Sequence, residues 1–398
     1  MKEVENWKKK LLLFGTLVAI LSVILMLGLM FWRQAKNKQA VGQSTAETEQ
    51  ANESSEPTAQ PAQSEELLPP KRISKLISTP VDGLAIKPGT NLALFYQGGN
   101  FLTIDPYTGK RSTLAAYPLG EFRSLEWNRE KDKLLVGYGY ERGYFIYDLS
   151  NNSFKKFRDK IDVAAWNYAG DKIVYKYYNA KSKRRKIRIA DLDGANSIVL
   201  VNNLPYRKVD FLPKPPTDKI CYFPVPDIKL RGHLVCLAPK RDDREEYAGN
   251  RGGDYLWSPD GSKLLTSFVK SPVENKLSLA VIEDSLQPAK ELGFATTVKK
   301  CVWSGDNLHV YCALLGGAPV DLPLPNAWEE KNFYSRDTFW KINTDTGEKE
   351  RLVEPEDIPE ELDVVDLVLD PEENFLFFRN RRDGSLWLLN LRFQEKEE

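Results

Sequence analysis

Histidine, methionine and cysteine are the residues of which this sequence has least. Its 398 residues include two His, three Met and four Cys. Histidine is the usual proton-transfer residue near neutral pH and the commonest metal ligand, so its scarcity disfavours histidine-based catalysis and metal sites. The four cysteines contain no Cys-x-x-Cys spacing of the kind that binds zinc. We therefore expect no metal, no cofactor and no catalytic residue.

The sequence also lacks an excess of charge of either sign. Its 56 Lys and Arg balance 56 Asp and Glu. A nucleic-acid-binding domain normally carries a basic patch and a high isoelectric point, so we expect no nucleic-acid partner. Aromatic residues, in contrast, are abundant, with nine Trp, 17 Tyr and 18 Phe. This composition favours β-strands.

One long apolar run lies near the N-terminus. Residues 11–32 contain no charged side chain, and 22 helical residues span roughly 33 Å, the thickness of a bilayer core. Because no small-residue cleavage site follows closely, we predict an uncleaved transmembrane helix over 11–32. The lysines before the run slightly outnumber the cations after it, which places residues 1–10 in the cytoplasm and the remainder outside, in a periplasmic or extracellular space.

The segment after this run has the composition of a disordered tether. Residues 40–68 contain six Glu, no basic residue and few large apolar side chains. Such a segment buries too little apolar surface to offset the entropy of ordering. We predict a disordered acidic linker over 33–69 and a single folded domain over 70–398.

A structural unit recurs through residues 71–398: an apolar strand that ends in an aromatic or large apolar residue, a polar turn and further apolar strands. The clearest copy begins at Trp257 and continues through Ser258, Pro259, Asp260 and Gly261. The other copies start at Ile86, Trp127, Trp166, Phe211, Trp303 and Leu369. Most starting points lie 39 to 46 residues apart, which is the period of a four-stranded propeller blade. We predict an all-β, seven-bladed β-propeller, with six or eight blades as the alternatives.

The two ends of this domain are expected to share a blade. After Leu369 the chain has room for only three strands before it becomes highly charged. Residues 72–79 have the pattern of an outer strand and precede the first inner strand. We therefore predict that this N-terminal segment completes the last blade, which would remove a free sheet edge.

Three motifs resemble the TolB-like propeller repeat, a relative of WD-repeat blades. They are the Trp-Ser-Pro-Asp-Gly turn at Trp257, the Lys-Leu-Leu that follows it and the Asp-Gly strand end at residues 190–196. The resemblance covers most of residues 80–395, with the strongest copies at Trp257, Trp166 and Trp303. It implies a propeller and suits a bacterial envelope protein. It indicates little about the ligand, because propellers serve many functions.

The four cysteines fall in two pairs on neighbouring strands. Cys221 and Cys236 are expected on the second and third strands of blade four, and Cys301 and Cys312 on the first and second strands of blade six. Cross-strand neighbours can form disulfides if their register permits. The alternative is four buried thiols that pack as small apolar side chains. Disulfides would indicate an oxidising compartment.

A long insertion in blade six, residues 315–336, interrupts the repeat. Loops of this length often carry function. Its prolines and apolar side chains have the composition of a contact surface, and we take Pro319, Leu324, Trp328 and Tyr334 as the candidate protein contact. The alternative is an insertion that packs over the ring.

Three smaller features each allow a structural explanation. Residues 191–196 resemble part of a calcium loop but lack the acidic residue that would complete it, so a hairpin turn is favoured. The basic run of residues 181–186 is either a solvated hairpin tip or a contact for anionic lipid or cell-wall polymer. His233 and His309 have no neighbouring nucleophile in the sequence and are expected to serve packing or surface roles.

These observations lead us to expect a membrane-tethered, non-enzymatic scaffold of the cell envelope that binds a protein partner on one propeller face. The alternative is a propeller that binds a glycan or cell-wall polymer, for which Asp321, Trp328 and Tyr334 are candidate contacts. An enzyme is disfavoured, because the sequence has neither the Gly-x-Ser-x-Gly turn of serine hydrolases nor the Asp-box repeat of sialidase propellers.

Overall fold

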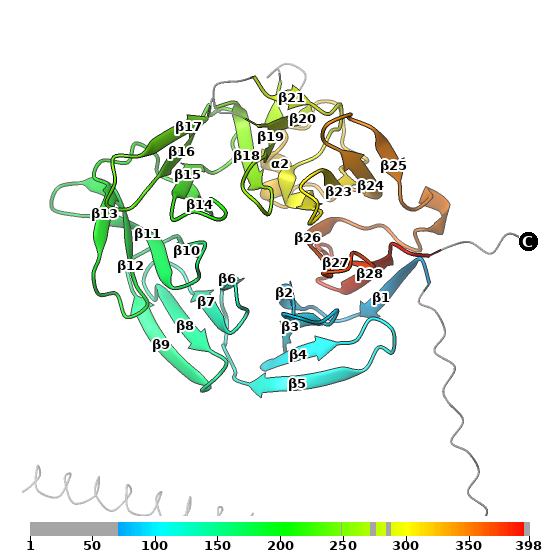
Figure 1. Ribbon diagram of the computed structural model, residues 1–398, viewed down its shortest axis with the longest axis horizontal. Coiled ribbons are helices and arrows are strands. Elements are labelled where there is room, and N and C mark those ends of the chain that lie inside the picture. Colours follow the sequence, from blue (N-terminus) through cyan, green and yellow to red (C-terminus); the bar gives the residue numbers. More distant parts are fainter. Residues whose placement is uncertain (1–70, 248, 271–275, 284–287, 394–398) are drawn as a thin grey trace, which may run out of the picture. The chain divides into compact units, whose positions relative to one another are not determined.

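The computed structural model describes residues 71–247, 249–270, 276–283 and 288–393. This part of the chain forms seven four-stranded antiparallel sheets, arranged as blades around a common centre (Figure 1). The prediction of an all-β, seven-bladed propeller is confirmed. The predicted transmembrane helix of residues 11–32 and the linker of residues 33–69 lie outside the described residues. Within the described part no helix has the length and hydropathy needed to cross a membrane.

Each blade is a meander whose first strand lies innermost. Blade one consists of β2 (Asp82–Ile86), β3 (Ala93–Gln97), β4 (Asn100–Ile104) and β5 (Arg111–Ala116). Blade two consists of β6 (Ser124–Trp127), β7 (Lys133–Gly137), β8 (Tyr144–Asp148) and β9 (Ser153–Arg158). Blade three consists of β10 (Ala164–Trp166), β11 (Lys172–Asn179), β12 (Arg184–Asp191) and β13 (Ile198–Val201). Blades four and five consist of β14 (Val209–Pro213), β15 (Ile220–Pro224), β16 (Leu234–Leu237) and β17 (Arg244–Tyr247); β18 (Arg251–Trp257), β19 (Leu264–Val269), β20 (Leu277–Ile282) and β21 (Lys290–Glu291). Blades six and seven consist of β22 (Cys301–Trp303), β23 (His309–Leu314), β24 (Thr338–Asn343) and β25 (Lys349–Arg351); β26 (Val364–Leu369), β27 (Phe375–Asn380), β28 (Leu386–Asn390) and β1 (Ile73–Ile77).

Helical structure in the described residues is limited to three short segments. The 3₁₀ helix η1 (Val298–Lys300) leads into β22, the α-helix α2 (Asn326–Glu329) lies in the blade-six insertion, and the 3₁₀ helix η2 (Pro355–Asp357) follows β25.

The core is divided among the blade interfaces. Seven hydrophobic clusters each join two neighbouring blades, and together they close the circle. The middle strands are therefore buried on both faces; every residue of β15 and β19 is buried. This explains why these strands are mostly apolar and do not alternate between apolar and polar residues. The outer strands β5 and β25, in contrast, are largely or fully exposed.

The aromatic residue that ends several inner strands links one blade to the next. The indole N–H of Trp127 donates to the Gly83 carbonyl at 2.6 Å, that of Trp166 to the Glu126 carbonyl at 2.9 Å, and that of Trp303 to the Leu256 carbonyl at 3.1 Å. Each acceptor lies on the inner strand of the preceding blade. The recurring Trp therefore both packs at an interface and ties two blades together.

The first and last strands of the domain share blade seven, as predicted. Strand β1 pairs antiparallel with β28, with Ile73 opposite Leu389 and Ile77 opposite Leu386. The Arg72 side chain extends this closure by donating to the Leu352 carbonyl of blade six at 2.6 Å. In Figure 1 the first and last coloured strands lie side by side.

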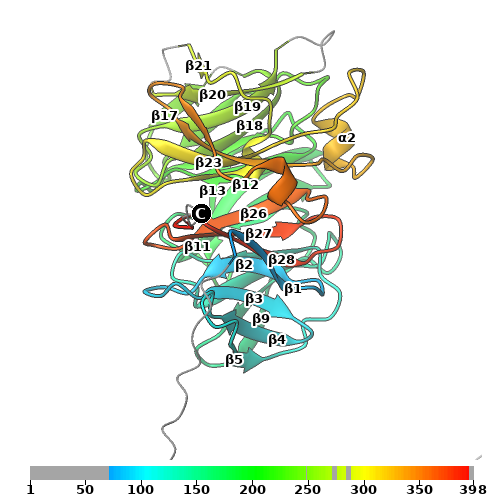
Figure 2. The same cartoon turned by 90° about the vertical axis from the view of Figure 1, so that its right-hand side faces the viewer.

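The blade-six insertion packs part of its apolar side chains onto the ring and leaves others, such as Val320, exposed. Helix α2 lies at one face of the propeller (Figure 2). Trp328 is 3% exposed and donates its indole N–H to the Asp363 carboxylate at 2.9 Å, and Leu324 is 6% exposed. The expectation that these two side chains face a partner is wrong, because they are buried where the insertion packs against the ring. Pro319 and Tyr334 are exposed.

Candidate functional site

Ionisable residues recur at the start of every inner strand. In each blade, one of them stands three or four positions before the last residue of the innermost strand. These residues, which we call the channel-mouth ring, are Asp82, Arg123, Asp162, Asp210, Asp254, Lys299 and Asp366. Because the inner strands of a propeller run in the same direction, the ring lies around one end of the central channel.

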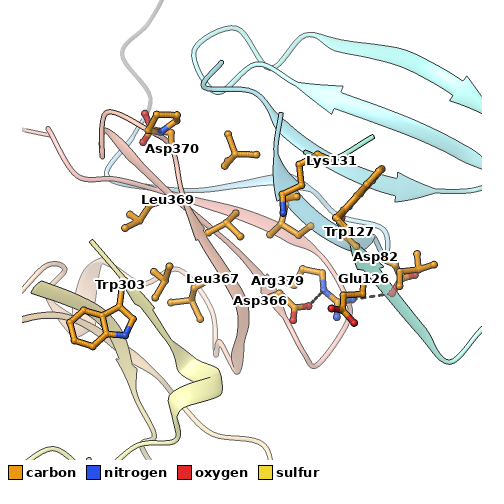
Figure 3. Close-up of a pocket in the computed structure, with 18 of the residues that line it drawn as sticks. Asp82, Glu126, Trp127, Lys131, Trp303, Asp366, Leu367, Leu369, Asp370 and Arg379 are labelled. Carbon is orange, nitrogen blue, oxygen red and sulfur yellow. Dashed lines mark hydrogen bonds and ion pairs between the residues drawn. The ribbon is translucent and has the colours of Figure 1, made fainter. Parts of the chain in front are cut away.

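The channel contains a cavity of about 790 Å³ that is lined mainly by blades one, two, six and seven, with Pro259 of blade five at its edge. Figure 3 shows the carboxylates of Asp82 and Asp366 on either side of the Arg379 guanidinium. Asp366 accepts from Arg379 at 2.6 Å, and Asp82 lies 3.2 Å from it. Arg379 also donates to the Val81 carbonyl at 2.7 Å. The guanidinium is thus fixed at the junction of blades seven and one.

Glu126 and Lys131 face the same cavity from blade two. Burial raises the pKa of the Glu126 carboxyl to about 7, against the smaller opposing effects of a backbone N–H from Trp166 and the charge of Lys131. Burial also lowers the pKa of the Lys131 ammonium, although the charge of Glu126 opposes this shift. Burial thus disfavours the charged form of both side chains, and the Glu126 carboxyl, with a pKa of about 7, can exchange protons in either direction near neutral pH.

The opposite side of the ring carries a second group of coupled charges. Asp254 is 4% exposed, and its Oδ2 has no hydrogen-bond partner among the described residues. The Lys299 ammonium lies 4.0 Å from this carboxylate and 2.8 Å from that of Glu329, which belongs to α2. Burial raises the pKa of Asp254 to about 6 and also raises the pKa of Asp210. The insertion therefore contributes one carboxylate to the channel mouth.

The remaining residues singled out in the sequence lie away from this cavity. His233 and His309 pair with Glu246 and Asp306 at 2.9 and 2.6 Å, and neither lines the cavity. The side chain of Asp191 accepts hydrogen bonds from Lys172 and Asn196, the arrangement of a hairpin turn. The described residues contain no group of three or more His, Cys, Asp or Glu arranged to hold a metal ion.

The structure joins the cysteines in the two predicted pairs. Cys221 lies directly opposite Cys236 in the β15–β16 ladder, and Cys301 lies opposite Cys312 in the β22–β23 ladder. Both pairs form disulfides. All four cysteines are buried in the hydrophobic clusters that join blades four to five and five to six. Their role in this structure is to hold adjacent strands together.

The channel-mouth ring was missed in the sequence, although a signal for it was present. Each member stands at nearly the same offset before the end of its inner strand. The signal becomes visible only when all seven blades are aligned on that residue, and in blade four the aligned position is Pro213, two residues after the expected Phe211. Glu126 and Lys131 lie outside this offset and had no sequence signal of their own.

Comparison with known proteins identifies the fold. No protein-family model matches the chain, and no curated protein matches it. Several solved structures are similar to this chain. An oligogalacturonate lyase in complex with manganese has a TM-score of 0.54 at 13% identity over 80% of this chain and 92% of the lyase. The oligogalacturonate lyase from Vibrio parahaemolyticus has a TM-score of 0.55 at 12% identity over 80% and 93%.

TolB from Acinetobacter baumannii is also similar, with a TM-score of 0.44 at 12% identity over 70% of this chain and 64% of that one. The repeat motifs implied a propeller, and the structure has one, with seven four-stranded blades. At 12 to 13% identity the likeness to the lyases establishes the fold alone.

These lyases contradict the functional expectation drawn from the sequence. The expected function is a non-enzymatic protein-binding scaffold, and it rests on the scarcity of histidine and on the absence of hydrolase and sialidase motifs. Solved structures with a similar fold nevertheless include oligogalacturonate lyases, which are enzymes. The conclusion that the chain is not an enzyme is therefore corrected, and so is the scaffold function that rested on it. The manganese of one lyase has no counterpart ligand cluster among the described residues here.

The identification that these observations allow is one of fold: the chain folds into a seven-bladed β-propeller whose channel mouth is lined by ionisable side chains.

Proposed function

We propose that the propeller is an enzyme that acts on a carbohydrate at the mouth of its central channel, with Glu126 as the general acid–base. The observation that carries this proposal is the position of Glu126 in a cavity of about 790 Å³, beside Lys131 and a fixed Arg379. The pKa of about 7 at Glu126 supports it. Titratable groups with shifted pKa values that line a cavity are typical of catalytic sites.

The chemistry of breaking a glycosidic bond fits this set of side chains. Both hydrolysis and β-elimination require one group to accept a proton and one to give a proton to the departing oxygen. Near pH 7 the Glu126 carboxyl is divided between its two protonation states, so it can serve either role. Arg379, Asp82 and Asp366 form a rigid donor and acceptor set for sugar hydroxyls. The oligogalacturonate named for the similar lyases supports a carbohydrate as the substrate class.

We also propose that residues 11–32 anchor the enzyme in a membrane, with residues 1–10 in the cytoplasm and the propeller in the periplasm or outside the cell. The uncharged run of 22 residues supports the anchor. The two disulfides support an oxidising compartment for the head. Protease protection of tagged ends in intact cells tests this orientation; accessibility of the N-terminal tag from outside would contradict it.

Substitution of Glu126 tests the catalytic proposal. Purified full-length protein is incubated with a panel of neutral and acidic oligosaccharides, and new reducing ends and unsaturated products are measured. We expect Glu126→Gln to lower kcat by about 10²- to 10⁴-fold, the usual contribution of a general acid–base. The wild-type rate should change with pH through an apparent pKa of about 7.

The matched control is Glu121→Gln, which makes the same chemical change at an exposed position outside the cavity. This variant should keep the wild-type rate. Equal rates for wild type and Glu126→Gln would contradict the role of Glu126. No turnover of any oligosaccharide by the wild type would contradict the proposed function.

A further inference from the structure

The hairpin of blade three carries a local excess of positive charge. Residues 172–190, which cover most of β11 and β12, contain eight cations and no acidic residue, whereas the chain as a whole is neutral. The cations are Lys172, Lys176, Lys181, Lys183, Arg184, Arg185, Lys186 and Arg188. The four residues from Lys181 to Arg184 are exposed at the tip of the hairpin. Such a local excess attracts anionic partners.

A groove lies beside the half of this hairpin that is nearest its tip. It has a volume of about 280 Å³ and combines residues from blades two, three and four. We call it the tyrosine–arginine groove; its lining residues are Tyr140, Asp162, Lys176, Tyr178, Arg185 and Arg207. Tyr140 and Tyr178 are 40% and 38% exposed, which is unusual for large aromatic side chains in this propeller.

The charges in the groove divide into two sets. Lys176 is buried, lies 2.8 Å from Asp162 and donates to the Arg207 carbonyl, so it holds the groove together. Arg185 and Arg207 have no ion pair among the described residues. The Arg185 guanidinium lies 5.8 Å from the ring centre of Tyr178, which stands directly opposite it in the β11–β12 ladder. The groove thus offers two guanidinium groups next to two tyrosine rings.

The groove adjoins the channel. Asp162 lines it and is also the blade-three member of the channel-mouth ring, and Arg207 precedes the blade-four member, Asp210, by three residues. A chain molecule lying in the groove would therefore have a short path past Asp162 to the channel mouth. No other member of the ring lines this groove.

From this arrangement we infer that the tyrosine–arginine groove is a binding site for an anionic polysaccharide, which it guides to the channel mouth. Guanidinium groups bind carboxylates and sulfates through paired hydrogen bonds. Tyrosine rings offer flat apolar surfaces with a polar edge, which suit the faces of sugar rings. The inference rests on the proposed function for the choice of a glycan. A membrane surface fits less well, because residues 180–186 contain no large apolar side chain to insert.

Equilibrium binding of full-length protein tests the groove without requiring turnover. The probes are polygalacturonate, uncharged dextran and phosphatidylglycerol vesicles. We expect polygalacturonate to bind, more weakly as salt is raised, and dextran not to bind. Arg185→Ala/Arg207→Ala should weaken the affinity at least about tenfold, as expected for the loss of charged hydrogen bonds. Tyr178→Ala should weaken it, and Tyr178→Phe should retain most of it.

The matched control removes two exposed cations at the edge of blade one, Lys110→Ala/Arg111→Ala, and should leave binding within about twofold, as expected for screened distant charges. Three results would each overturn the inference. They are an equal loss of affinity in this control, no binding of polygalacturonate by the wild type, and groove-dependent binding of vesicles alone. Glu126→Gln should bind polygalacturonate like the wild type. If the wild type binds through the groove but cleaves no oligosaccharide, the proposed activity fails and the binding site stands.

Discussion

At the scale of single residues, the position of Glu126 carries a cost in stability. In the unfolded chain this carboxyl ionises near the ordinary glutamate pKa of 4.5, whereas burial raises its pKa in the folded protein to about 7. Between these two values the folded state binds the extra proton. The stability that the protonated Glu126 carboxyl contributes is therefore fully present below about pH 4.5 and is lost as the pH rises through about 7.

This cost predicts that Glu126→Gln stabilises the fold at alkaline pH. At pH 8 the variant should be more stable than the wild type by about 1–3 kcal/mol, since each pKa unit corresponds to about 1.4 kcal/mol. The difference should shrink as the pH falls toward 4.5. Urea unfolding of both proteins across this range measures it. A difference that does not vary with pH would contradict the raised pKa.

Lys300 is the opposite case, a buried charge that the fold requires. It is fully buried, and its ammonium lies 2.5 Å from Asp337, 2.6 Å from Asp363 and 2.9 Å from the Val364 carbonyl. Lys300→Met would leave the buried Asp337 carboxylate without a cation and Asp363 with Arg381 alone, and breaking such a buried pair typically costs about 3–5 kcal/mol. Denaturant unfolding measures the loss. Lys349→Met, at an exposed position on β25 of the same blade, is the control and should change stability little.

At the scale of elements, the indole links between blades predict a contrast between two tryptophans. Trp166 donates to the Glu126 carbonyl at 2.9 Å, whereas the buried Nε1 of Trp257 has no partner among the described residues. Trp166→Phe should therefore cost about 1 kcal/mol more than Trp257→Phe, the net value of one hydrogen bond. Thermal or urea unfolding compares the two variants. Equal losses of stability in the two variants would show that the lost volume of the indole ring, and not its hydrogen bond, sets the cost.

The elements that could be predicted from the sequence are those fixed by local patterns. The turn after Trp257 and its echoes place the strand pairs, and the outer-strand pattern of residues 72–79 places β1. The blade-six insertion could not be placed in this way. Burial of Trp328 depends on Asp363 and on Arg381, which donates to the Trp328 carbonyl at 2.6 Å and lies 53 residues away. Nothing near Trp328 in the sequence indicates these partners.

At the scale of the whole molecule, the candidate site is a product of ring geometry. Each blade supplies one ionisable group, and only the closed circle brings Asp82 and Asp366 to the same arginine, from opposite ends of the sequence. The sequence repeat predicted the circle but not the chemistry at its mouth. A pKa shift such as that of Glu126 arises from burial between blades, which a single blade does not reveal.

Ring closure by β1 should therefore control the stability of all seven blades. Ile73 belongs to the hydrophobic cluster between blades six and seven, and Ile77 to the cluster between blades seven and one. Replacing both with Ala removes buried groups at roughly 2–5 kcal/mol each and weakens two interfaces together. We expect hydrogen exchange to rise even in β11, across the ring, whereas Ser74→Ala in the same strand should leave it unchanged. Exchange that rises only in blade seven would indicate that the blades unfold separately, and the shared arginine site would then survive an open ring.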